Sequence, residues 1–390
     1  MMTCVHFFAC HLFITMAILG SLNINGGASQ SRMLQVVNLI KQQKLDVAFF
    51  LQETHSTPAS HSVWNRMMKK TGYFSDSNSR TAEVAFLLSL HFCPPQLSFQ
   101  EIIPGYLASL DFVDNNIEFT LINVYAPSKG TDRRSFFKRL RLYMRQLDLQ
   151  KCIVMGGDFN CTLQPARDRN GAEPHPGSAR LLSDIIRDFS LQDIWRIQNP
   201  NTHQFTWSKV ANNQVALARL DRFYMNSLLI NLSPTTRISP SGFSDHHLIT
   251  TCYRIGSSPN RHSFWKLNIS ILDNPSFNSA FQSVWSNLVG AKPQFKDQRL
   301  WWDNTKVQIR NFCQHFCSLN TQVERRIKAE LEKEILQIQS NLKTHPAPQQ
   351  KLRLHEKKSL LNSIITNHTQ GVLTRLRFQH LHLLDNPTLF

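Results

Sequence analysis

The sequence predicts an α/β (or α+β) domain built on a mixed β-sheet covered by helices, followed by a helical arm. Two observations carry this prediction. Up to residue 255, short apolar runs typical of strands alternate with segments whose apolar residues recur every three or four positions, as they do on one face of a helix. After a polar break at Ser257–Arg261, the strand-like runs stop and helical periodicity takes over.

The expected strands are seven apolar runs rich in β-branched residues. They lie at 17–24, 46–52, 84–89, 117–125, 152–156, 219–225 and 248–253. Three segments with helical spacing, Met33–Gln43, Ser135–Leu147 and Arg180–Phe189, fall between them. Strands that alternate with helices, together with neighbouring strand runs that resemble hairpins, favour a mixed sheet.

Beyond residue 262 the apolar residues follow a helical period. The repeat runs from Val323 to Leu342, Thr344–Pro348 interrupts it, and Lys351–Leu373 resumes it as a second basic helix. This pattern indicates a helical hairpin or a coiled-coil-like arm. The predicted parts are an N-terminal extension of unassigned role at 1–16, an α/β domain at 17–255 and a basic helical connector at 256–390.

Charge and composition narrow the class of partner. The chain has 43 Lys and Arg against 27 Asp and Glu, a net charge of +16, and 42% hydrophobic residues, so it is globular and strongly basic. Such a field favours a polyanion, of which nucleic acid is the commonest, although a merely basic surface is the alternative.

The cysteines and the N-terminus favour an intracellular protein. The eight cysteines include no CxxC pair, and Cys313 and Cys317 flank His315 without a second pair of zinc ligands, which favours reduced thiols. The apolar stretch Thr3–Leu19 lacks an early positive charge and a cleavage site. We therefore expect a nuclear or cytoplasmic location, without secretion.

Six short motifs place polar residues next to the apolar runs. They are SLNING (21–26), LQETH (51–55), NVYAP (123–127), GDFN (157–160), ARLDRFY (218–224) and SDHH (244–247). Polar side chains at successive strand ends converge on one edge of a sheet. A carboxylate there suits a divalent metal, with acid and base groups around a phosphate.

Glu53 in LQETH is the candidate for the metal. Its carboxylate follows the buried run Val47–Leu51, and a single hard carboxylate is a usual Mg²⁺ ligand. Taken alone, the motif fits an ordinary surface glutamate better than a metal ligand. Its place among the other motifs favours the functional reading.

GDFN supplies a candidate base. Gly156 and Gly157 let the backbone leave the strand tightly, and Asp158 and Asn160 then share a face. Asp158 can take a proton from water while the Asn160 amide holds that water or a phosphate oxygen. The alternative is a plain turn, since all these residues form turns.

SDHH supplies an imidazole. His246 can donate a hydrogen bond to a phosphate oxygen whose charge grows in the transition state. A carboxylate on its other ring nitrogen would orient it, and Asp221 in ARLDRFY is the expected partner. His247 is expected to pack internally or to face solvent.

Together the six motifs resemble the endonuclease/exonuclease/phosphatase family over residues 17–255. The likeness is greatest to the endonuclease domain of LINE-type (non-LTR) retrotransposons, relatives of apurinic/apyrimidinic endonucleases and exodeoxyribonuclease III. The resemblance implies a four-layer α/β sandwich of two mostly antiparallel sheets flanked by helices. It also implies hydrolysis of a DNA phosphodiester with Mg²⁺, or alternatively Mn²⁺, that leaves a 3′-hydroxyl, by a monomer with no membrane partner.

The resemblance also assigns roles position by position. Glu53 resembles the principal metal ligand, assisted by Asn25 or Asp245, and Asn23 resembles the residue that arranges metal and phosphate. Asp158 resembles the group that activates water, and Asn160 resembles the group that orients this water. Tyr125 resembles the phenol that contacts the scissile phosphate. His246 with Asp221 resembles the pair that stabilises the transition state. Thr206, Trp207 and Ser244 resemble DNA-contact residues.

Some positions depart from, or select among, family patterns. Asn25 favours the retrotransposon branch, since apurinic endonucleases generally carry Asp there. Tyr125 argues against DNase I-like members and sphingomyelinases, which use a His nearby. Glu83 stands where relatives usually have a Gly, so a strained turn is expected there. Ser208–Ala218 resembles a hairpin that inserts into DNA, with a plain surface hairpin as the alternative.

Other functions stay open on the sequence. One is a catalytically inactive nucleic-acid-binding transposon remnant, and another is an abasic-site endonuclease or 3′–5′ exonuclease. A phosphatase of lipids or inositol phosphates is a third. The arm resembles the connector before a reverse transcriptase, and the chain contains no adjacent Asp–Asp pair, so a reading frame cut short before the polymerase is expected.

Overall fold

A computed structural model gives the structure of the chain. It describes residues 14–384 except for 28, 43–45, 78–82, 90–91, 93, 95, 115, 212–213, 232–233, 258–266, 268 and 345–346. The chain divides into two compact units, Met1–Pro259 with Glu332–Val372, and Asn260–Leu331 with Leu373–Phe390. The first unit therefore includes part of the predicted helical connector. Of the predicted extension 1–16, only 14–16 are described, and they begin the first strand.

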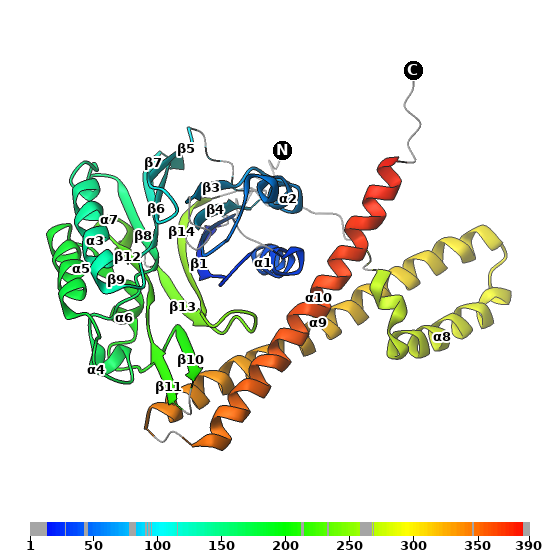
Figure 1. Ribbon diagram of the computed structural model, residues 1–390. Coiled ribbons are helices and arrows are strands. Elements are labelled where there is room, and N and C mark those ends of the chain that lie inside the picture. Colours follow the sequence, from blue (N-terminus) through cyan, green and yellow to red (C-terminus); the bar gives the residue numbers. More distant parts are fainter. Residues whose placement is uncertain are drawn as a thin grey trace, which may run out of the picture. The chain divides into compact units, whose positions relative to one another are not determined.

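Two six-stranded sheets form the centre of the first unit (Figure 1). The first sheet has the order β13-β14-β1-β2-β4-β3 and the second β5-β6-β7-β8-β12-β9. Each sheet contains a single parallel pair, β1 with β2 and β7 with β8, and its other pairs are antiparallel. The strands of the first sheet are β1 (Ile14–Asn23), β2 (Asp46–Gln52), β3 (Tyr73–Asp76), β4 (Glu83–Leu88), β13 (Thr235–Ser239) and β14 (Leu248–Ser257). Those of the second are β5 (Ser98–Ile103), β6 (Leu107–Asp114), β7 (Ile117–Tyr125), β8 (Cys152–Asp158), β9 (Gln192–Asp193) and β12 (Asp221–Met225).

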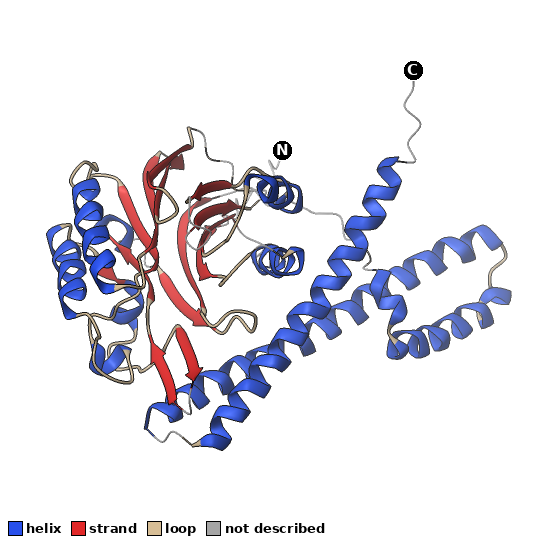
Figure 2. Ribbon diagram, in the orientation of Figure 1, coloured by secondary structure: helices blue, strands red, loops and turns tan. Residues whose placement is uncertain are grey.

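Helices cover the outer faces of both sheets (Figure 2). The helices α1 (Gln30–Gln42) and α2 (Pro58–Met68) lie outside the first sheet, and α3 (Gly130–Met144) and α5 (Pro176–Asp188) lie outside the second. The short helices are α4 (Pro165–Asp168), α6 (Ile194–Gln198) and α7 (Ser227–Ile230). The predicted four-layer α/β sandwich with two mostly antiparallel sheets is confirmed.

The main core fills the space between the sheets. Phe50 of β2 makes edge-on contacts with Phe86 of β4, at 5.0 Å between ring centroids, and with Phe223 of β12, at 5.3 Å. These rings are fully or almost fully buried, so each removes a large apolar area from water. A second core, which includes Phe137 and Leu182, packs between the second sheet and α3 and α5.

All seven predicted strands are present, but several elements were missed. The edge strand β5 exposes half of its side chains, which leaves no continuous apolar run in its sequence. Helix α2 buries only Trp64, Met67 and Met68, so its periodicity is weak. These segments adopt regular structure because of their contacts with neighbouring elements, and their own sequence pattern does not reveal it.

Glu83 is a strand residue rather than the residue of a strained turn. It begins β4, pairs in register with Asp76 and is 4% exposed. Its carboxylate accepts a hydrogen bond from Thr54. The strain expected at this position is therefore absent, and a buried acid takes its place.

The predicted hairpin is present as a separate two-stranded sheet of β10 (Trp207–Ala211) and β11 (Gln214–Ala218). Its strands pair in register from Trp207 with Ala218 to Ala211 with Gln214. The turn residues at the tip, 212 and 213, lie outside the described part of the chain. Whether the hairpin enters DNA stays a prediction.

The helical arm forms two long helices, α9 (Gln298–Thr344) and α10 (Pro348–Leu384), which confirms the predicted helical hairpin. The part of the arm that belongs to the first unit buries apolar residues on both helices. Among them are Ile335 and Leu342 on α9 and Leu361 on α10. This burial shows that the later part of the periodic stripe seen in the sequence is a packed face, whereas Val323 and Ile327 at its start are exposed.

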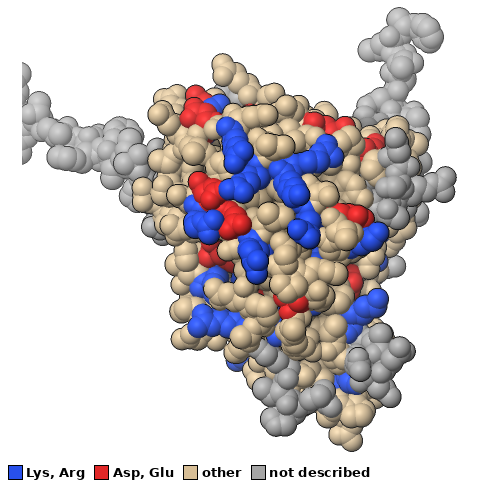
Figure 3. All heavy atoms as spheres, turned by 60° about the vertical axis from the view of Figure 1, so that its left-hand side comes forward, with Lys and Arg blue, Asp and Glu red and all other residues tan. Residues whose placement is uncertain are grey.

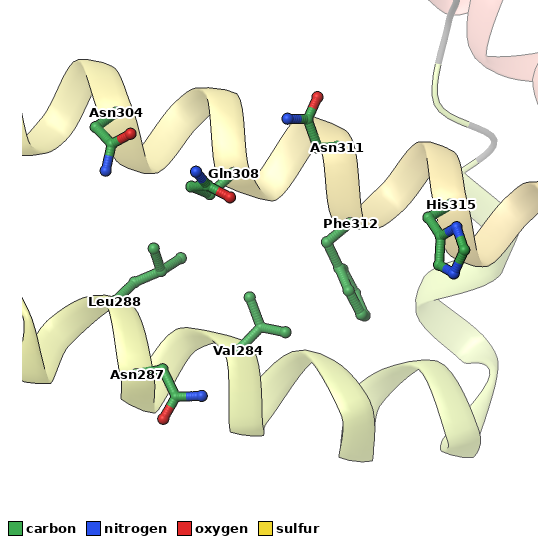
Figure 4. A pocket seen from close by; sticks show the side chains of 8 residues that line it. All are labelled: Val284, Asn287, Leu288, Asn304, Gln308, Asn311, Phe312 and His315. Carbon is green, nitrogen blue, oxygen red and sulfur yellow. The ribbon is translucent and has the colours of Figure 1, made fainter.

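In the second unit, α8 (Pro275–Gly290) packs against the first part of α9 around Phe277, Phe281, Phe312 and Phe316. Two short 3₁₀ turns, η1 (Ile269–Asp273) and η2 (Lys292–Gln294), flank α8. A shallow pocket lies between the two helices, lined by residues that include Leu288, Asn304 and His315 (Figure 4).

The described cysteines, Cys152, Cys161, Cys252, Cys313 and Cys317, carry free thiols.

Basic side chains gather on the outer side of the second sheet (Figure 3). Exposed residues on α3 and α5 include Arg134, Lys138, Arg139 and Arg180, whereas Arg141 is paired with Asp188. Within the described part of the chain, the helices are all too short or too polar to cross a bilayer.

Candidate active site

The strand topology brings the predicted residues together. Parallel β1 and β2 end side by side, as do parallel β7 and β8, where Tyr125 pairs in register with Asp158. The antiparallel strand β12 begins at the same edge, with Asp221 in register with Asp158. Because both parallel pairs end at this edge, four motifs that are far apart in sequence meet there (Figure 1).

Glu53 follows β2 and is held from two sides. Its Oε1 accepts hydrogen bonds from Asn23 Nδ2 at 2.9 Å and from the Tyr125 hydroxyl at 2.8 Å. Asn23 Nδ2 also lies 3.1 Å from Asp158 Oδ2, so one amide joins the two carboxylates. Tyr125 in turn stacks on Tyr106, with 5.9 Å between ring centroids.

Asp158 ends β8 and is 1% exposed. Its Oδ1 accepts the Asn160 backbone N–H at 2.9 Å, and the Asn160 side chain is fixed by the Ala126 carbonyl at 2.8 Å. The turn depends on Gly157, which has φ +137° and where an added Cβ would lie 1.9 Å from the Val124 carbonyl oxygen. A glycine is therefore required to bring Asp158 to this edge.

His246 and Asp221 form the predicted pair. His246 Nδ1 lies 2.9 Å from Asp221 Oδ2, and His246 Nε2 lies 3.9 Å from Asp158 Oδ2. Both Asp221 and His246 are buried. The Nε2 atom thus faces the base candidate, while the other nitrogen is committed to Asp221.

Burial and charge shift the pKa values at this site. Burial, reinforced by the neighbouring Asp221, raises the pKa of Asp158, although His246 opposes this. Burial alone would lower the pKa of His246, but the charges of Asp221 and Asp158 outweigh it and raise that pKa. Burial, followed by the charges of Glu53 and Asp158, raises the pKa of Tyr125, so its phenol stays protonated as a donor.

A second group of polar residues lies beside this network. Asn25 Nδ2 donates to Asp245 Oδ1 at 3.0 Å, and the Trp207 indole donates to Asp245 Oδ2 at 3.0 Å. Ser244 Oγ donates to the Asn23 carbonyl at 2.8 Å, which ties the SDHH loop to the end of β1. The Asn25 backbone N–H donates to Asn23 Oδ1 at 3.0 Å, so the two groups are connected.

Two of the three predicted DNA-contact residues are buried in the site's framework. Thr206 is fully buried, and its Oγ1 accepts the backbone N–H groups of Leu220 and Asp221 at 2.9 and 3.0 Å. Ser244 is 8% exposed and holds Asn23. The geometry gives both residues a positioning role and leaves Trp207 as the partly exposed member of the three.

Hard oxygen donors suited to a divalent cation are present. Of the two carboxylate oxygens of Glu53, only Oε1 has hydrogen-bond partners among the described residues, which leaves Oε2 available for a metal ion. Asn25 and Asp245 add an amide oxygen and a carboxylate oxygen. Asp158, Asp221 and His246 also bring possible ligand atoms within 4.8 Å of one another. Because His246 Nδ1 already contacts Asp221, the set of Asp158, Asp221 and His246 is better suited to proton transfer than to binding a metal ion.

The backbone at these loops is strained, as functional loops often are. Three non-glycine site residues have positive φ: Asn25 at 46°, Glu53 at 53° and Asn160 at 49°. Such conformations persist only where the surrounding structure enforces them. The hydrogen bonds of Glu53 and Asn160 described above provide that enforcement.

Sequence reasoning missed residues that support the site from below. Gln52 Nε2 donates to Asn123 Oδ1 at 2.8 Å, and Asn123 Nδ2 donates to the Ala85 carbonyl at 2.9 Å, which joins the two sheets beneath Glu53. Both residues are polar members of otherwise apolar runs, and this was the available signal. A buried ion pair between Arg219 and Asp168 lies behind Asp221, and despite burial Arg219 lowers the pKa of Asp168 to about 2.

His247 packs internally, one of the two placements expected for it. It is fully buried, and its Nε2 lies 2.9 Å from Gln339 Oε1 on α9. Burial, with the charge of Lys358, lowers the pKa of His247 to about 3, so it is neutral. It therefore plays no part in the charge of the neighbouring His246 pair.

The chain is similar to several known proteins. It is 33% identical over 373 residues to the transposon TX1 uncharacterized 149 kDa protein of Xenopus laevis. The aligned region covers 95% of this chain and 28% of that protein. The chain thus spans about 28% of the length of this curated relative.

Solved structures with a similar course of the backbone include two endonucleases. An AP endonuclease from Archaeoglobus fulgidus has a TM-score of 0.49 at 20% identity, over 61% of this chain and 99% of that one. The endonuclease domain of TRAS1, a telomere-specific non-LTR retrotransposon, has a TM-score of 0.47 at 12% identity, again over 61% and 99%. TDP2 from Caenorhabditis elegans has a TM-score of 0.46 at 19% identity, over 62% and 75%.

The family model matches residues 20–246, which is more than half of the chain and includes five of the six motifs in full and SDHH as far as His246. With the sandwich fold and the site geometry, it establishes that the chain belongs to the Endonuclease/Exonuclease/phosphatase family.

Proposed function

We propose that the protein is a Mg²⁺-dependent phosphodiester hydrolase that nicks one strand of duplex DNA and leaves a 3′-hydroxyl. The observation that carries this proposal is the unbroken set of contacts from Glu53 through Asn23 and Asp158 to His246 and Asp221. It supports the presence of a candidate metal carboxylate, a candidate base and an imidazolium at one edge. The family supports cleavage of a phosphoester, and the net charge of +16 with the transposon relative supports a nucleic acid.

Asp158 is the proposed base. A carboxylate with a raised pKa is a stronger base once ionised, and Asn160 and Asn23 hold its two oxygens in place. It takes a proton from the attacking water as the water oxygen bonds to phosphorus. The bond from phosphorus to the 3′ oxygen breaks, and its electron pair leaves with that oxygen, which takes up a proton from solvent water to become the 3′-hydroxyl.

His246 is the proposed stabiliser of the phosphate in the transition state. Its raised pKa keeps the imidazolium charged at neutral pH, and Asp221 fixes its Nδ1, so Nε2 donates toward the reaction edge. The Tyr125 hydroxyl has one proton, which it donates to Glu53 in this structure, so it would turn from Glu53 to donate to the same phosphate. Asn23 keeps Glu53 and Asp158 in register.

Glu53, with Asn25 or Asp245, would hold the Mg²⁺ ion, which when bound neutralises charge on the phosphate. Mn²⁺ is the alternative cation. Trp207, with Thr206 and Ser244 behind it, is proposed to face the DNA beside the β10–β11 hairpin. We further propose that the protein is a monomer and acts in the nucleus or cytoplasm.

Incubation of the full chain with supercoiled plasmid and Mg²⁺ tests the proposal. Relaxed circles should form, EDTA should abolish them, and Glu53→Ala and His246→Ala should each slow nicking by about 10²-fold or more. Glu101→Gln, at an exposed position of β5, should nick at the wild-type rate. DNA binding without nicking would instead identify a catalytically inactive nucleic-acid-binding protein.

An oligonucleotide duplex with one abasic site distinguishes the remaining DNA activities. The proposed nicking enzyme cuts intact duplex at least as fast as the abasic duplex. Strong preference for the abasic site, or stepwise loss of 3′ nucleotides, would replace the proposal with an abasic-site endonuclease or a 3′–5′ exonuclease.

A further inference from the structure

The helical hairpin made by the end of α9 and the start of α10 packs against the loop that carries the SDHH motif. Gln339 of α9 contacts His247 directly, and Glu332 pairs with Arg237 of β13 at 3.1 Å. At Gly242 an added Cβ would lie 3.1 Å from the backbone nitrogen of Asn362 on α10. These contacts lie within the first compact unit, so the hairpin is part of the same body as the active site.

This packing brings Lys358 of α10 to the rim of the site. Its Nζ donates to Ser208 Oγ on β10 at 2.9 Å. Ser208 follows Trp207, whose indole binds Asp245, and the Ser208 backbone N–H donates to the Asp245 carbonyl at 3.2 Å. The ammonium group therefore lies beside the residues proposed to face DNA.

Negative charge compensates Lys358 only partly, through the attraction of Asp245. Its neighbours on the hairpin, Arg353 and Lys357, both pair with Glu334, at 3.9 and 2.6 Å. Among the described residues, Lys358 forms no salt bridge, and of its three donors one is used by Ser208. A half-buried cation that forms no ion pair is costly unless an anion joins it.

The group is charged under the conditions in which it would act. Burial lowers the pKa of Lys358 to about 8, with Asp245 acting in the opposite direction. The ammonium form therefore predominates at neutral pH. A cation with two unused donors, at the edge where the scissile phosphate is proposed to lie, fits a phosphate oxygen of the same strand or its complement.

We propose that Lys358 binds a backbone phosphate of the nucleic acid, so that the α9–α10 hairpin forms part of the substrate-binding surface. The assignment rests on the proposed function, since it needs DNA at this edge. It gives the hairpin a role in the reaction of the nuclease itself, beyond that of a connector. The contact is independent of base sequence, because it is made to phosphate.

Salt-dependent binding of the full chain to a DNA duplex tests the assignment. Cleavage is prevented by EDTA, and the affinity is measured over a series of NaCl concentrations. Lys358→Gln should bind about 5- to 10-fold more weakly near 0.1 M salt, and the slope of log affinity against log salt should fall by about 0.9. Lys358→Arg should keep the slope. Lys333→Gln removes one exposed charge from the same hairpin and should leave affinity and slope unchanged.

The slope separates phosphate binding from a structural role, since a lysine that only supports packing would not change the number of ions released. A wild-type slope in Lys358→Gln, in a chain whose wild type nicks plasmid, would overturn this assignment alone. Loss of slope in Lys333→Gln to the same extent would also overturn it. A wild-type chain that neither binds nor nicks DNA would refute the proposed function, and this assignment with it.

Discussion

Replacing Asp221 by Asn tests the role of the His246 pair most directly. The substitution keeps the size of the side chain but removes the charge 2.9 Å from His246 Nδ1. With an effective dielectric constant of about 20, two unit charges at that distance interact by about 6 kcal/mol, which is an upper limit because desolvation opposes it. Part of this energy stabilises the imidazolium in the transition state. We expect Asp221→Asn to slow nicking by about 10²- to 10⁴-fold.

The pH dependence supplies a second, independent readout. Asp221 raises the pKa of His246, so the wild-type imidazolium persists as pH rises through neutrality. Without that carboxylate, burial lowers the pKa, and the imidazolium is lost at a lower pH. The ratio of mutant to wild-type rate should therefore be smaller at pH 8 than at pH 6. The substitution also removes a charge that raises the pKa of Asp158, so the mutant base ionises at a lower pH, and this change makes the ratio smaller at high pH as well.

The assay is the initial rate of plasmid nicking by the full chain at saturating Mg²⁺, over pH 6 to about 8.5, a span around the ordinary histidine pKa. Asp184→Asn, on the surface of α5, is the matched control and should behave as wild type. A deficit below about 5-fold, or a ratio that does not change with pH, would refute a charged His246 held by Asp221.

Three further predictions concern stability, each measured by urea unfolding. Gly157→Ala should cost more than about 3 kcal/mol, because its Cβ would overlap the Val124 carbonyl. Gln339→Ala should cost about 1–3 kcal/mol, because it leaves the buried His247 without its partner. Glu83 has a pKa of about 7 in the folded protein, raised by burial and then by Asp76, against 4.5 as an ordinary value. The folded state therefore binds the proton more tightly than the unfolded state. The stability of the wild type should fall by at most about 3 kcal/mol as pH rises from about 4.5 to 7, and the stability of Glu83→Gln should not show this fall.

Each of these variants has a matched control. Gly171 has φ +144° but open space around its Cβ position, so Gly171→Ala isolates the backbone cost and should lose about 1 kcal/mol. Gln337→Ala and Glu101→Gln change exposed positions and should leave stability within about 0.5 kcal/mol of wild type. Equal losses of stability in Gly157→Ala and Gly171→Ala would contradict the explanation by overlap with Val124. Equal losses of stability in Gln339→Ala and Gln337→Ala would contradict the explanation by the contact with His247. A pH dependence that persists in Glu83→Gln would exclude Glu83 as its source.

The strands and the chemistry of their ends were readable in the sequence. Alternation and β-branched runs are local properties, so β1, β2, β7 and β8 were predicted with small errors at their ends. The pairing of His246 with Asp221 was also predicted, because an imidazole that carries charge needs an acceptor on its second nitrogen. Edge strands such as β5 were missed, since their exposure leaves no apolar pattern.

The sequence by itself determined which chemical groups the protein carries, in what order, and which runs form the layers, because these depend on residue type and local period. Apart from the pairing of His246 with Asp221, only the tertiary structure decided which distant residues touch. Thr206 beneath Asp221, Gln52 against Asn123 and Lys358 against Ser208 join residues 15, 71 and 150 positions apart. Such contacts depend on how the sheets and the helical hairpin pack as whole surfaces, which no short stretch of sequence encodes.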